Sequence, residues 1–255
     1  MSWWYVVYWI ATLILSEVLR PKVNVTDAAA VNAEDADMPV VSSTKPIPVI
    51  WGKIRMRDPN LTWYGDYYTI PIKKRAGKGG FLGTGKTIWQ TVGYRYYWGQ
   101  HLALCHGPVT LHRIWAEERE IWAGTSSGGL IVIDSEGLYG GEDNGGGLAG
   151  KINFLPGSQT QDVDPYLVKK LTNVPAYRGV ASCVWYGPSM TMPERQEWVD
   201  AALDIADPSH APHYSGTKQS GYIGTSPIPR VMSFELSRYP ANLVPAKAKI
   251  GDDCN

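Results

Sequence analysis

Two stretches of the sequence decide the fold: residues 61–72 read LTWYGDYYTIPI, and residues 87–107 read TIWQTVGYRYYWGQHLALCHG. Both place β-branched and aromatic residues between Gly, Asp and Pro, which is the pattern of β-strands separated by turns. The same pattern recurs at residues 47–56 (IPVIWGKIRM) and 119–124 (REIWAG). We therefore expect a mainly β protein of the β-rich α+β class, with antiparallel strands and few helices.

The composition is typical of a globular β protein. The chain has 255 residues, of which 27 are Gly, 11 Trp and 15 Tyr, against only 3 Phe. Trp and Tyr favour strands and half-buried surfaces, where their polar tips find partners. The 24 Lys and Arg balance the 24 Asp and Glu. A zero net charge excludes a protein whose main role is to neutralise nucleic-acid phosphate.

The cysteines indicate the compartment in which the chain folds. Cys105, Cys183 and Cys254 cannot all pair within one chain, and no CxxC motif occurs. A small secreted fold that is stabilised by disulfides usually has an even number of cysteines. We expect free, mostly buried thiols and folding in a reducing cytoplasm.

The sequence pattern divides the chain into five segments. In order, these are a hydrophobic helix (1–20), an extended linker (21–45), the first part of a β domain (46–125), a glycine-rich loop or insertion (126–165) and the remaining β segment (166–255). Pro21 ends the first helix, because proline cannot continue it.

The last segment contains the clearest signals for helices after the N-terminus. Residues 193–206 predict a short amphipathic helix, because a capping box precedes an apolar face of helical period. A short helix or turn is expected at residues 165–171. Strands are expected at residues 179–186 and 230–238.

The N-terminal apolar run, residues 3–15 (WWYVVYWIATLIL), is shorter than the roughly 20 residues that a membrane-spanning helix needs. A signal peptide carries Lys or Arg before its apolar core, but no Lys or Arg precedes this run. Three interpretations stay open: a helix packed inside protein, a helix at a membrane interface, and a cleaved signal.

Residues 80–87 (GFLGTGKT) match the GxxxxGK[ST] pattern of P-loop nucleotide-binding proteins, and Asp134 follows an apolar run as a Walker B aspartate does. In such a site Lys86 would reach phosphate oxygens, and Thr87 with Asp134 would hold magnesium. A P-loop must follow a buried strand and open a helix. Here a basic stretch precedes the motif and a strand pattern follows it, which favours a solvated hairpin tip. The P-loop NTPase remains the alternative function.

Other polar groups are candidates for metal binding or catalysis. They are His101, Cys105, His106 and His112; Asp207, His210 and His213; and Glu117, Glu118, Glu120, Asp134 and Glu136. Zinc needs four ligands that converge on a tetrahedron, and on a helix His106 would point away from His101 and Cys105. Acidic runs on loops between strands are usually solvated. We expect no metal, no cofactor and no enzymatic activity.

A series of short phrases carries a resemblance over roughly residues 21–255. The phrases are 45–52 (KPIPVIWG), 59–66 (PNLTWYGD), 92–97 (VGYRYY), 101–108 (HLALCHGP), 113–115 (RIW), 121–124 (IWAG), 145–150 (GGGLAG), 174–179 (VPAYRG), 223–229 (IGTSPIP) and 236–240 (LSRYP). In this order they resemble the tail hub proteins of long-tailed bacteriophages and gene transfer agents. That family is similar to the baseplate hub of contractile tails and to the N-terminal part of the lambda-like central tail-tip protein.

The resemblance implies a structural virion protein that folds in the host cytoplasm. It implies a homotrimer that closes the distal end of the tail tube, with β-barrel domains that imitate tube subunits. The implied partners are the distal tail protein ring, the tape-measure C-terminus and other tail-tip or fibre proteins, without sequence-specific nucleic acid. The implied roles are host cell attachment and genome ejection. Because family chains usually run well beyond a phrase like residues 251–255, we expect this chain to be the front part of a hub.

Two sets of residues are candidates for these contacts. Exposed Trp and Tyr are favoured interface anchors, and the candidates are Trp51, Trp63, Tyr64, Trp115 and Trp122. In the N-terminal helix, three copies are expected to bundle in the tube lumen against the tape-measure C-terminus, with transient host membrane contact after release. The candidates there are Trp3, Trp4, Val7, Ile10 and Ile14. A membrane-anchored envelope β-protein is the further alternative.

Overall fold

The computed structural model describes residues 28–29, 45–78, 87–141, 144–187 and 221–239. Strands account for most of these residues, and the one helix among them is short. The elements are β1 (Gly52–Met56), β2 (Asn60–Lys78), β3 (Thr87–His106), β4 (Thr110–Ala116), β5 (Arg119–Ser126), β6 (Gly129–Ser135), β7 (Leu148–Leu155), α2 (Pro165–Lys170), β8 (Val180–Trp185), β9 (Tyr222–Gly224) and β10 (Met232–Arg238). The expectation of a mainly β protein is confirmed.

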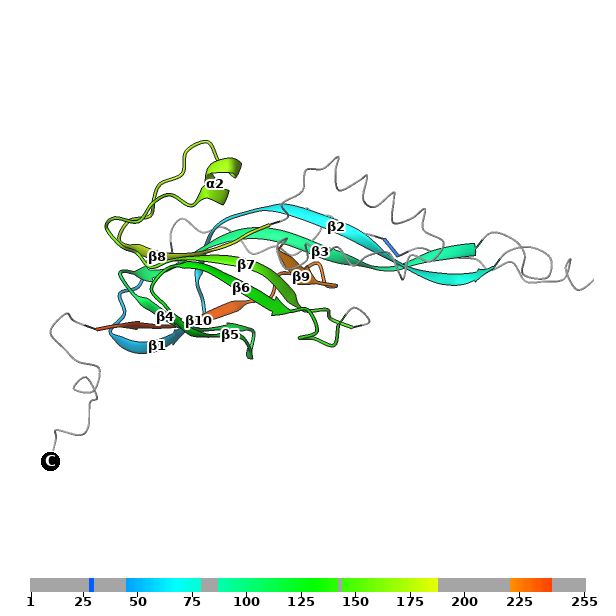
Figure 1. The fold of residues 1–255 in the computed structure, drawn as a ribbon, viewed down its shortest axis with the longest axis horizontal. Helices are drawn as coiled ribbons and strands as arrows, with labels where there is room; N and C mark the ends of the chain where they lie inside the picture. The colour runs from blue at the N-terminus through cyan, green and yellow to red at the C-terminus, as the bar shows by residue number, and fades with distance from the viewer. Residues whose placement is uncertain (1–27, 30–44, 79–86, 142–143, 188–220, 240–255) are drawn as a thin grey trace, which may run out of the picture.

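The strands form two antiparallel sheets (Figure 1). One is four-stranded, in the order β1-β10-β4-β5, and the other is six-stranded, in the order β2-β3-β8-β7-β6, with β9 beside β3 and β7. The chain changes from one sheet to the other between β1 and β2, between β3 and β4, between β5 and β6, and between β9 and β10. Each sheet is therefore built from segments far apart in the sequence, such as β1 and β10.

The hydrophobic core lies between the two sheets, because side chains alternate across each strand and both sheets turn one apolar face inward. A single cluster joins Trp98, Phe154 and Trp185 of the six-stranded sheet to Ile114 and Phe234 of the four-stranded sheet. All five side chains are almost fully buried. Burial on this scale is the main stabilising term of the fold.

The expected closed β-barrel is wrong for the single chain. Among the described strands, β1 and β5 lie at the edges of one sheet, and β2 and β6 lie at the edges of the other. The chain crosses between sheets at short connections, so the sheets stack face to face and neither curls round to meet its own edge.

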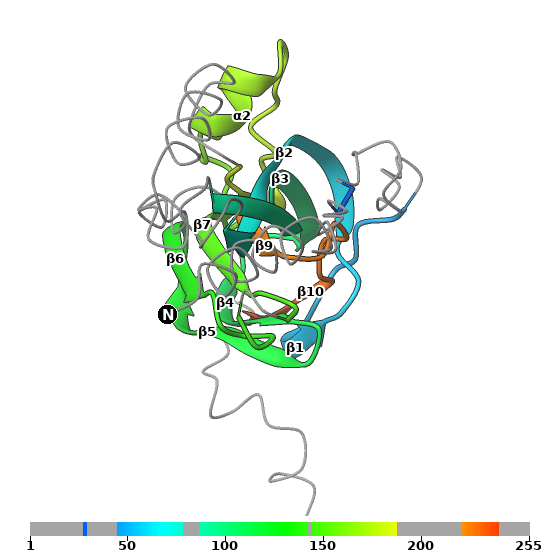
Figure 2. The same ribbon diagram turned by 90° about the vertical axis from the view of Figure 1, so that its right-hand side faces the viewer.

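The helix α2 adds a layer on the outer face of the six-stranded sheet (Figure 2). Asp164 is its N-cap, and its Oδ1 accepts hydrogen bonds of 2.9 Å from the backbone N–H groups of Tyr166 and Leu167. Leu167 is buried in a second apolar cluster with Leu155 and Val184. The short helix expected at residues 165–171 is confirmed.

The glycine-rich segment contains two strands that the sequence interpretation missed. Within residues 126–165, β6 and β7 pair in register from Gly129↔Phe154 to Ser135↔Leu148, and only the connection between them is a loop. Gly146 in that loop has a φ of +72°, and a Cβ there would lie 2.6 Å from the Tyr222 hydroxyl oxygen. Glycine is therefore required where this loop meets β9.

The hairpin of β2 and β3 is the longest feature of the fold, and its outer end projects beyond the other strands (Figure 1). β3 pairs with β8 only from Gln100 to His106 and with β9 only at Tyr96 and Tyr97. We call residues 69–78 of β2 with residues 87–95 of β3 the distal arm. There the two strands pair with each other, and Ala28 donates its N–H to the Thr91 carbonyl oxygen at 3.1 Å.

Several predictions from the sequence lie outside the described residues. These are the N-terminal helix with Trp3, Trp4, Val7, Ile10 and Ile14, most of the linker, the helix at 193–206 and residue Cys254. Within the part of the chain that the structure describes, no helix is long and apolar enough to cross a membrane.

Candidate functional site

Trp51 is the most exposed of the five predicted interface anchors. It directly precedes β1, and 63% of its surface is accessible. The Arg238 guanidinium carbon lies 5.3 Å from the centroid of its ring, which is within the range of a cation–π contact. Val49 and Ile54 beside it in sequence are also exposed. Trp51 is therefore exposed at the β1 edge of the four-stranded sheet, in a stretch of sequence with other exposed apolar residues.

Tyr64 is exposed on one side of its ring only. Its ring is stacked on that of Trp98, with centroids 4.9 Å apart and an interplanar angle of 7°. Trp98 is completely buried, so one face of Tyr64 covers the core. The remaining 40% of its surface is accessible to a partner.

Trp63 and Trp122 have their main contacts within the chain. Trp63 is half-buried beneath α2, with its ring edge-on to that of Tyr166 at a centroid distance of 5.9 Å. Trp122 packs against the main core from β5. Gly124 leaves room for its ring, since a Cβ there would lie 2.7 Å from a ring carbon.

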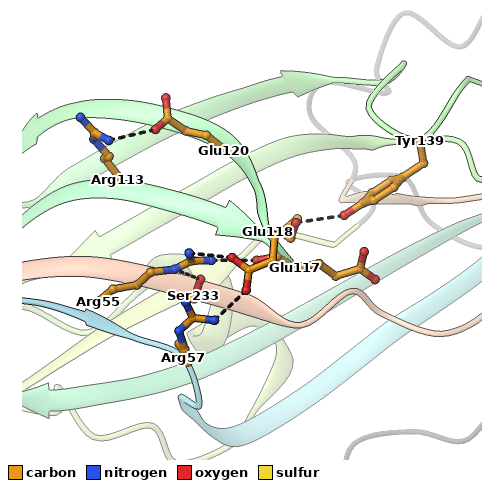
Figure 3. A network of polar contacts seen from close by, with 9 residues as sticks. Arg55, Arg57, Arg113, Glu117, Glu118, Glu120, Tyr139 and Ser233 are labelled. Atoms are coloured by element: carbon orange, nitrogen blue, oxygen red, sulfur yellow. Dashed lines mark hydrogen bonds and ion pairs between the residues drawn. The ribbon is translucent and has the colours of Figure 1, made fainter.

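Trp115 lies on the outer face of the four-stranded sheet under the guanidinium group of Arg55, whose Cζ is 4.3 Å from the ring centroid. Arg55 also donates from Nε to Ser233 Oγ at 3.0 Å and from Nη2 to the Glu117 carbonyl oxygen at 2.9 Å. These contacts link β1, β10 and the end of β4 (Figure 3). Trp115 is therefore held by a charged neighbour from a strand distant in sequence.

Glu117 and Glu118 form the turn between β4 and β5, where the chain adopts a left-handed conformation at Glu117 (φ 55°). Glu118 accepts hydrogen bonds from Arg55 at 2.8 Å and from Arg57 at 2.6 Å (Figure 3). These two bonds lower the pKa of the Glu118 carboxyl group. Glu117 pairs with Arg230 at 3.0 Å. We call Arg55, Arg57, Glu117, Glu118 and Ser233 the turn network.

Tyr139, in the loop after β6, stands beside the turn network. Its hydroxyl donates to the Ala116 carbonyl oxygen at 3.2 Å, and the guanidinium carbons of Arg119 and Arg230 lie 5.2 and 4.4 Å from its ring centroid. Burial raises the pKa of its phenol group. The cations and acids on this side of the molecule are thus bound largely to one another, which is an arrangement that fixes a turn.

The first histidine group does not converge on one point. His101 is fully buried and Cys105, four residues further along β3, is buried as well, whereas His106 is exposed. His112 lies on the four-stranded sheet, 2.7 Å from Ser237 Oγ. Across the residues that the structure describes, no three His, Cys, Asp or Glu are placed to hold a metal ion. Asp207, His210 and His213 lie outside the described residues.

His101 has an unusual environment for an ionisable group. Its Nδ1 is 2.6 Å from Thr62 Oγ1, and the same hydroxyl oxygen lies 3.1 Å from the His101 carbonyl oxygen. Its Nε2 is buried with no hydrogen-bond partner. Burial lowers its pKa to about 4, against a smaller opposing effect of Asp164. His101 is therefore a neutral core residue near pH 7.

The two described cysteines are free and buried. Cys105 on β3 and Cys183 on β8 lie on neighbouring strands, and burial raises the pKa of the Cys105 thiol to about 11 and that of Cys183 further. Such thiols are unreactive near pH 7. The expectation of free, buried thiols is confirmed for these two residues.

The structure on either side of the P-loop pattern differs from that of a nucleotide-binding site. Residues 80–86 lie outside the described residues, but Lys78 and Thr87 on either side pair in register at the outer end of the β2–β3 hairpin. Thr87 begins a strand, whereas a P-loop opens a helix. Asp134 lies on β6, at the opposite edge of the six-stranded sheet from β2.

Sequence reasoning missed a second polar cluster, which fixes α2 to the sheet. The Tyr166 hydroxyl donates to Asp66 Oδ2 at 2.5 Å, and Lys170 pairs with the same carboxylate at 2.8 Å. A Cβ at Gly99 would lie 2.2 Å from the Tyr166 hydroxyl oxygen. The glycine in a strongly aromatic strand was the one local sign that another side chain approaches there.

No protein-family model matches the chain, and no curated protein matches it.

Proposed function

We propose that the chain is a structural component of the tail tip or baseplate of a long-tailed bacteriophage or gene transfer agent. Three copies would form a hub at the distal end of the tail tube, joined to the distal tail protein ring, the tape measure and the tip or fibre proteins. The ordered phrases along the sequence and a mainly antiparallel two-sheet fold support this proposal. The chain would act in the virion through its surfaces, without catalysis.

The observation that carries the proposal is the apolar edge at Trp51. Its accessible surface is 63%, and Val49 at 55% and Ile54 at 37% lie within the same stretch. A large aromatic side chain among exposed aliphatic ones is the pattern of an interface anchor. Arg238 holds one face of the ring, so the indole is oriented before a partner binds.

Trp51 and Trp63 provide a matched pair of variants. Trp51→Ala should weaken self-association or binding to the distal tail protein about tenfold or more, since a central anchor contributes over roughly 1.4 kcal/mol. The same change should leave the thermal unfolding temperature nearly unchanged. Trp63→Ala should lower the free energy of unfolding by about 2 kcal/mol, because the ring packs beneath α2, and should leave association of the folded protein intact.

The measurements are light scattering of the purified chain, alone and with the distal tail protein, together with the protein composition of purified particles. A trimer, and the chain at the tail tip, are the expected results. Absence of the chain from particles, or equal loss of association in both variants, would contradict the proposal.

A further inference from the structure

Strand β6 is an edge strand with an exposed apolar face. It ends the six-stranded sheet and pairs with β7 on its inner side. Leu130 and Val132 point away from the core between the sheets, and 54% and 53% of their surfaces are accessible. Ile131 and Ile133, which alternate with them, are buried in that core. β6 therefore presents two large aliphatic side chains at the edge of a sheet.

β6 lacks most of the features that protect an edge strand from contact with another chain, which are Pro, Lys and irregular pairing. Residues 129–135 (GLIVIDS) contain no Pro, Lys or Arg, and β6 pairs with β7 without a shift in register. By contrast, β1 carries Lys53 and Arg55. β2 contains Pro71 and its pairing with β3 shifts at four places, and the pairing of β5 with β4 shifts at two. Among the edges that the structure describes, β6 is the least protected.

The exposed apolar stretch at Trp51 lies on the opposite side of the two stacked sheets from β6. β1 and β5 are the edges of one sheet, and β2 and β6 are the edges of the other. Residues 57–59 connect β1 to β2, and residues 127–128 connect β5 to β6. Such short connections place β1 and β2 on one side and β5 and β6 on the other (Figure 2). A contact between Trp51 and β6 therefore joins two different copies of the chain.

The two edges are chemically suited to each other. Arg238 covers one face of the Trp51 ring, and the exposed Val49 and Ile54 flank this residue in the sequence. An indole that packs on aliphatic side chains and excludes water is typical of an interface anchor. Because β1 and β6 each end a sheet, backbone pairing between them can add to the contact.

We propose that β6 of each copy packs against the β1 edge of the next copy, with the Trp51 indole seated on Leu130 and Val132. Two different edges make a head-to-tail contact, which closes into a ring, whereas a twofold contact uses one patch twice. A threefold ring needs the head-to-tail kind. This inference rests on the proposed trimer and identifies the surface that receives its Trp51 anchor.

A matched pair of substitutions separates β6 from other exposed surface. Val132→Lys places a charge against the Trp51 indole and should weaken trimer formation of the full chain about tenfold or more. Val168 on α2 has 55% of its surface accessible, and Val168→Lys should associate like the unchanged chain. Both variants should keep the thermal unfolding temperature, because both side chains are exposed. Light scattering over a series of chain concentrations measures the association.

Cysteine cross-linking tests which edges meet. Every variant carries Cys254→Ser, and the remaining Cys105 and Cys183 are buried. Chains with Leu130→Cys are mixed with chains with Val49→Cys and treated with a short bis-maleimide. The mixture should give cross-linked dimers, whereas each variant alone should give none. A chain with both substitutions should give cross-linked trimers.

The outcomes separate this inference from the proposed function. Normal trimer formation by Val132→Lys, with loss of the trimer in Trp51→Ala, would overturn the β6 contact and leave the tail-tip role standing. Cross-linking of Leu130→Cys chains to one another would also overturn it, because that result requires a twofold contact. The expected cross-links in a chain that is absent from particles would support the β6 contact and contradict the tail-tip role.

Discussion

The turn network and the distal arm differ in the acids that adjoin their cations in the sequence. In the turn network, Arg55 and Arg57 meet Glu118 at 2.8 and 2.6 Å, and Arg55 also covers Trp115. In the distal arm, the sequence supplies cations with no acid from residue 67 to residue 116. Charges matched across strands distant in sequence fix the turn between β4 and β5.

The two regions also differ in how much they bury. Strands of the turn network lie over the core between the sheets, where Ile114 and Phe234 are fully buried. On the distal arm, Ile70, Ile72 and Thr91 are buried, whereas Val92 has 46% of its surface accessible. A two-stranded ribbon is marginally stable in isolation, so the body of the protein should account for most of its stability.

Core truncation is the largest expected effect. Phe234→Ala should lower the free energy of unfolding by about 3–5 kcal/mol, because it removes a fully buried ring and leaves a cavity. Val92→Ala in the distal arm should change it by less than about 0.5 kcal/mol. Urea unfolding of the two variants measures the difference. Equal losses would mean that the arm belongs to the same cooperative core as the body.

Acid should destabilise the body through His101. Its pKa is lowered to about 4 in the folded chain, against about 6.5 when unfolded. The unfolded chain therefore binds more protons between these values, so the stability falls as the pH decreases from about 6.5 to about 4. The loss should reach on the order of 3 kcal/mol at about pH 4.

Unfolding by urea at a series of pH values measures this loss. Carboxyl groups also titrate in the range, so the contribution of His101 is the difference in slope between the unchanged chain and His101→Asn. The exposed His106→Gln serves as the control and should keep the slope of the unchanged chain. A His101→Asn variant with that same slope would contradict the assignment.

Loss of a single cation should have the smallest effect and should distinguish the two regions directly. Arg55→Ala removes hydrogen bonds to Ser233, Glu117 and Glu118 and the contact with Trp115. Arg55→Ala should lower the free energy of unfolding by about 1 kcal/mol at low salt. The loss should be smaller at high salt, because exposed ion pairs are screened. Lys73→Ala should cost less than about 0.5 kcal/mol. Thermal unfolding at two salt concentrations measures both variants. A larger loss of stability in Lys73→Ala than in Arg55→Ala would contradict this prediction.

Much of the local structure could be predicted from the sequence. The strands that contain residues 61–72 and 87–107 were evident from their β-branched and aromatic runs, and the short helix or turn expected at residues 165–171 coincides with α2. Strands β6 and β7 were missed because glycines surround them and weaken the alternation on which strand prediction depends.

The candidate site was less predictable, because exposure depends on what covers each face. Alternation shows that Trp115 and Ile114 point to opposite sides of β4, but it does not show which side meets the other sheet. Trp51 and Trp63 look alike as sequence signals, yet one is largely exposed and the other packs beneath α2.

The sequence by itself determined the β class, the positions of the main strands and the absence of acids between residues 67 and 116. Only the tertiary structure decided that the strands stack as two sheets, that Arg55 meets Glu118 across 63 positions of sequence, and that the cations lie on a projecting hairpin. The physical reason is the separation in sequence between the residues that interact. Strand propensity and charge are properties of a few adjacent residues, whereas strand order, burial and ion pairing depend on contacts that form only when distant segments come together.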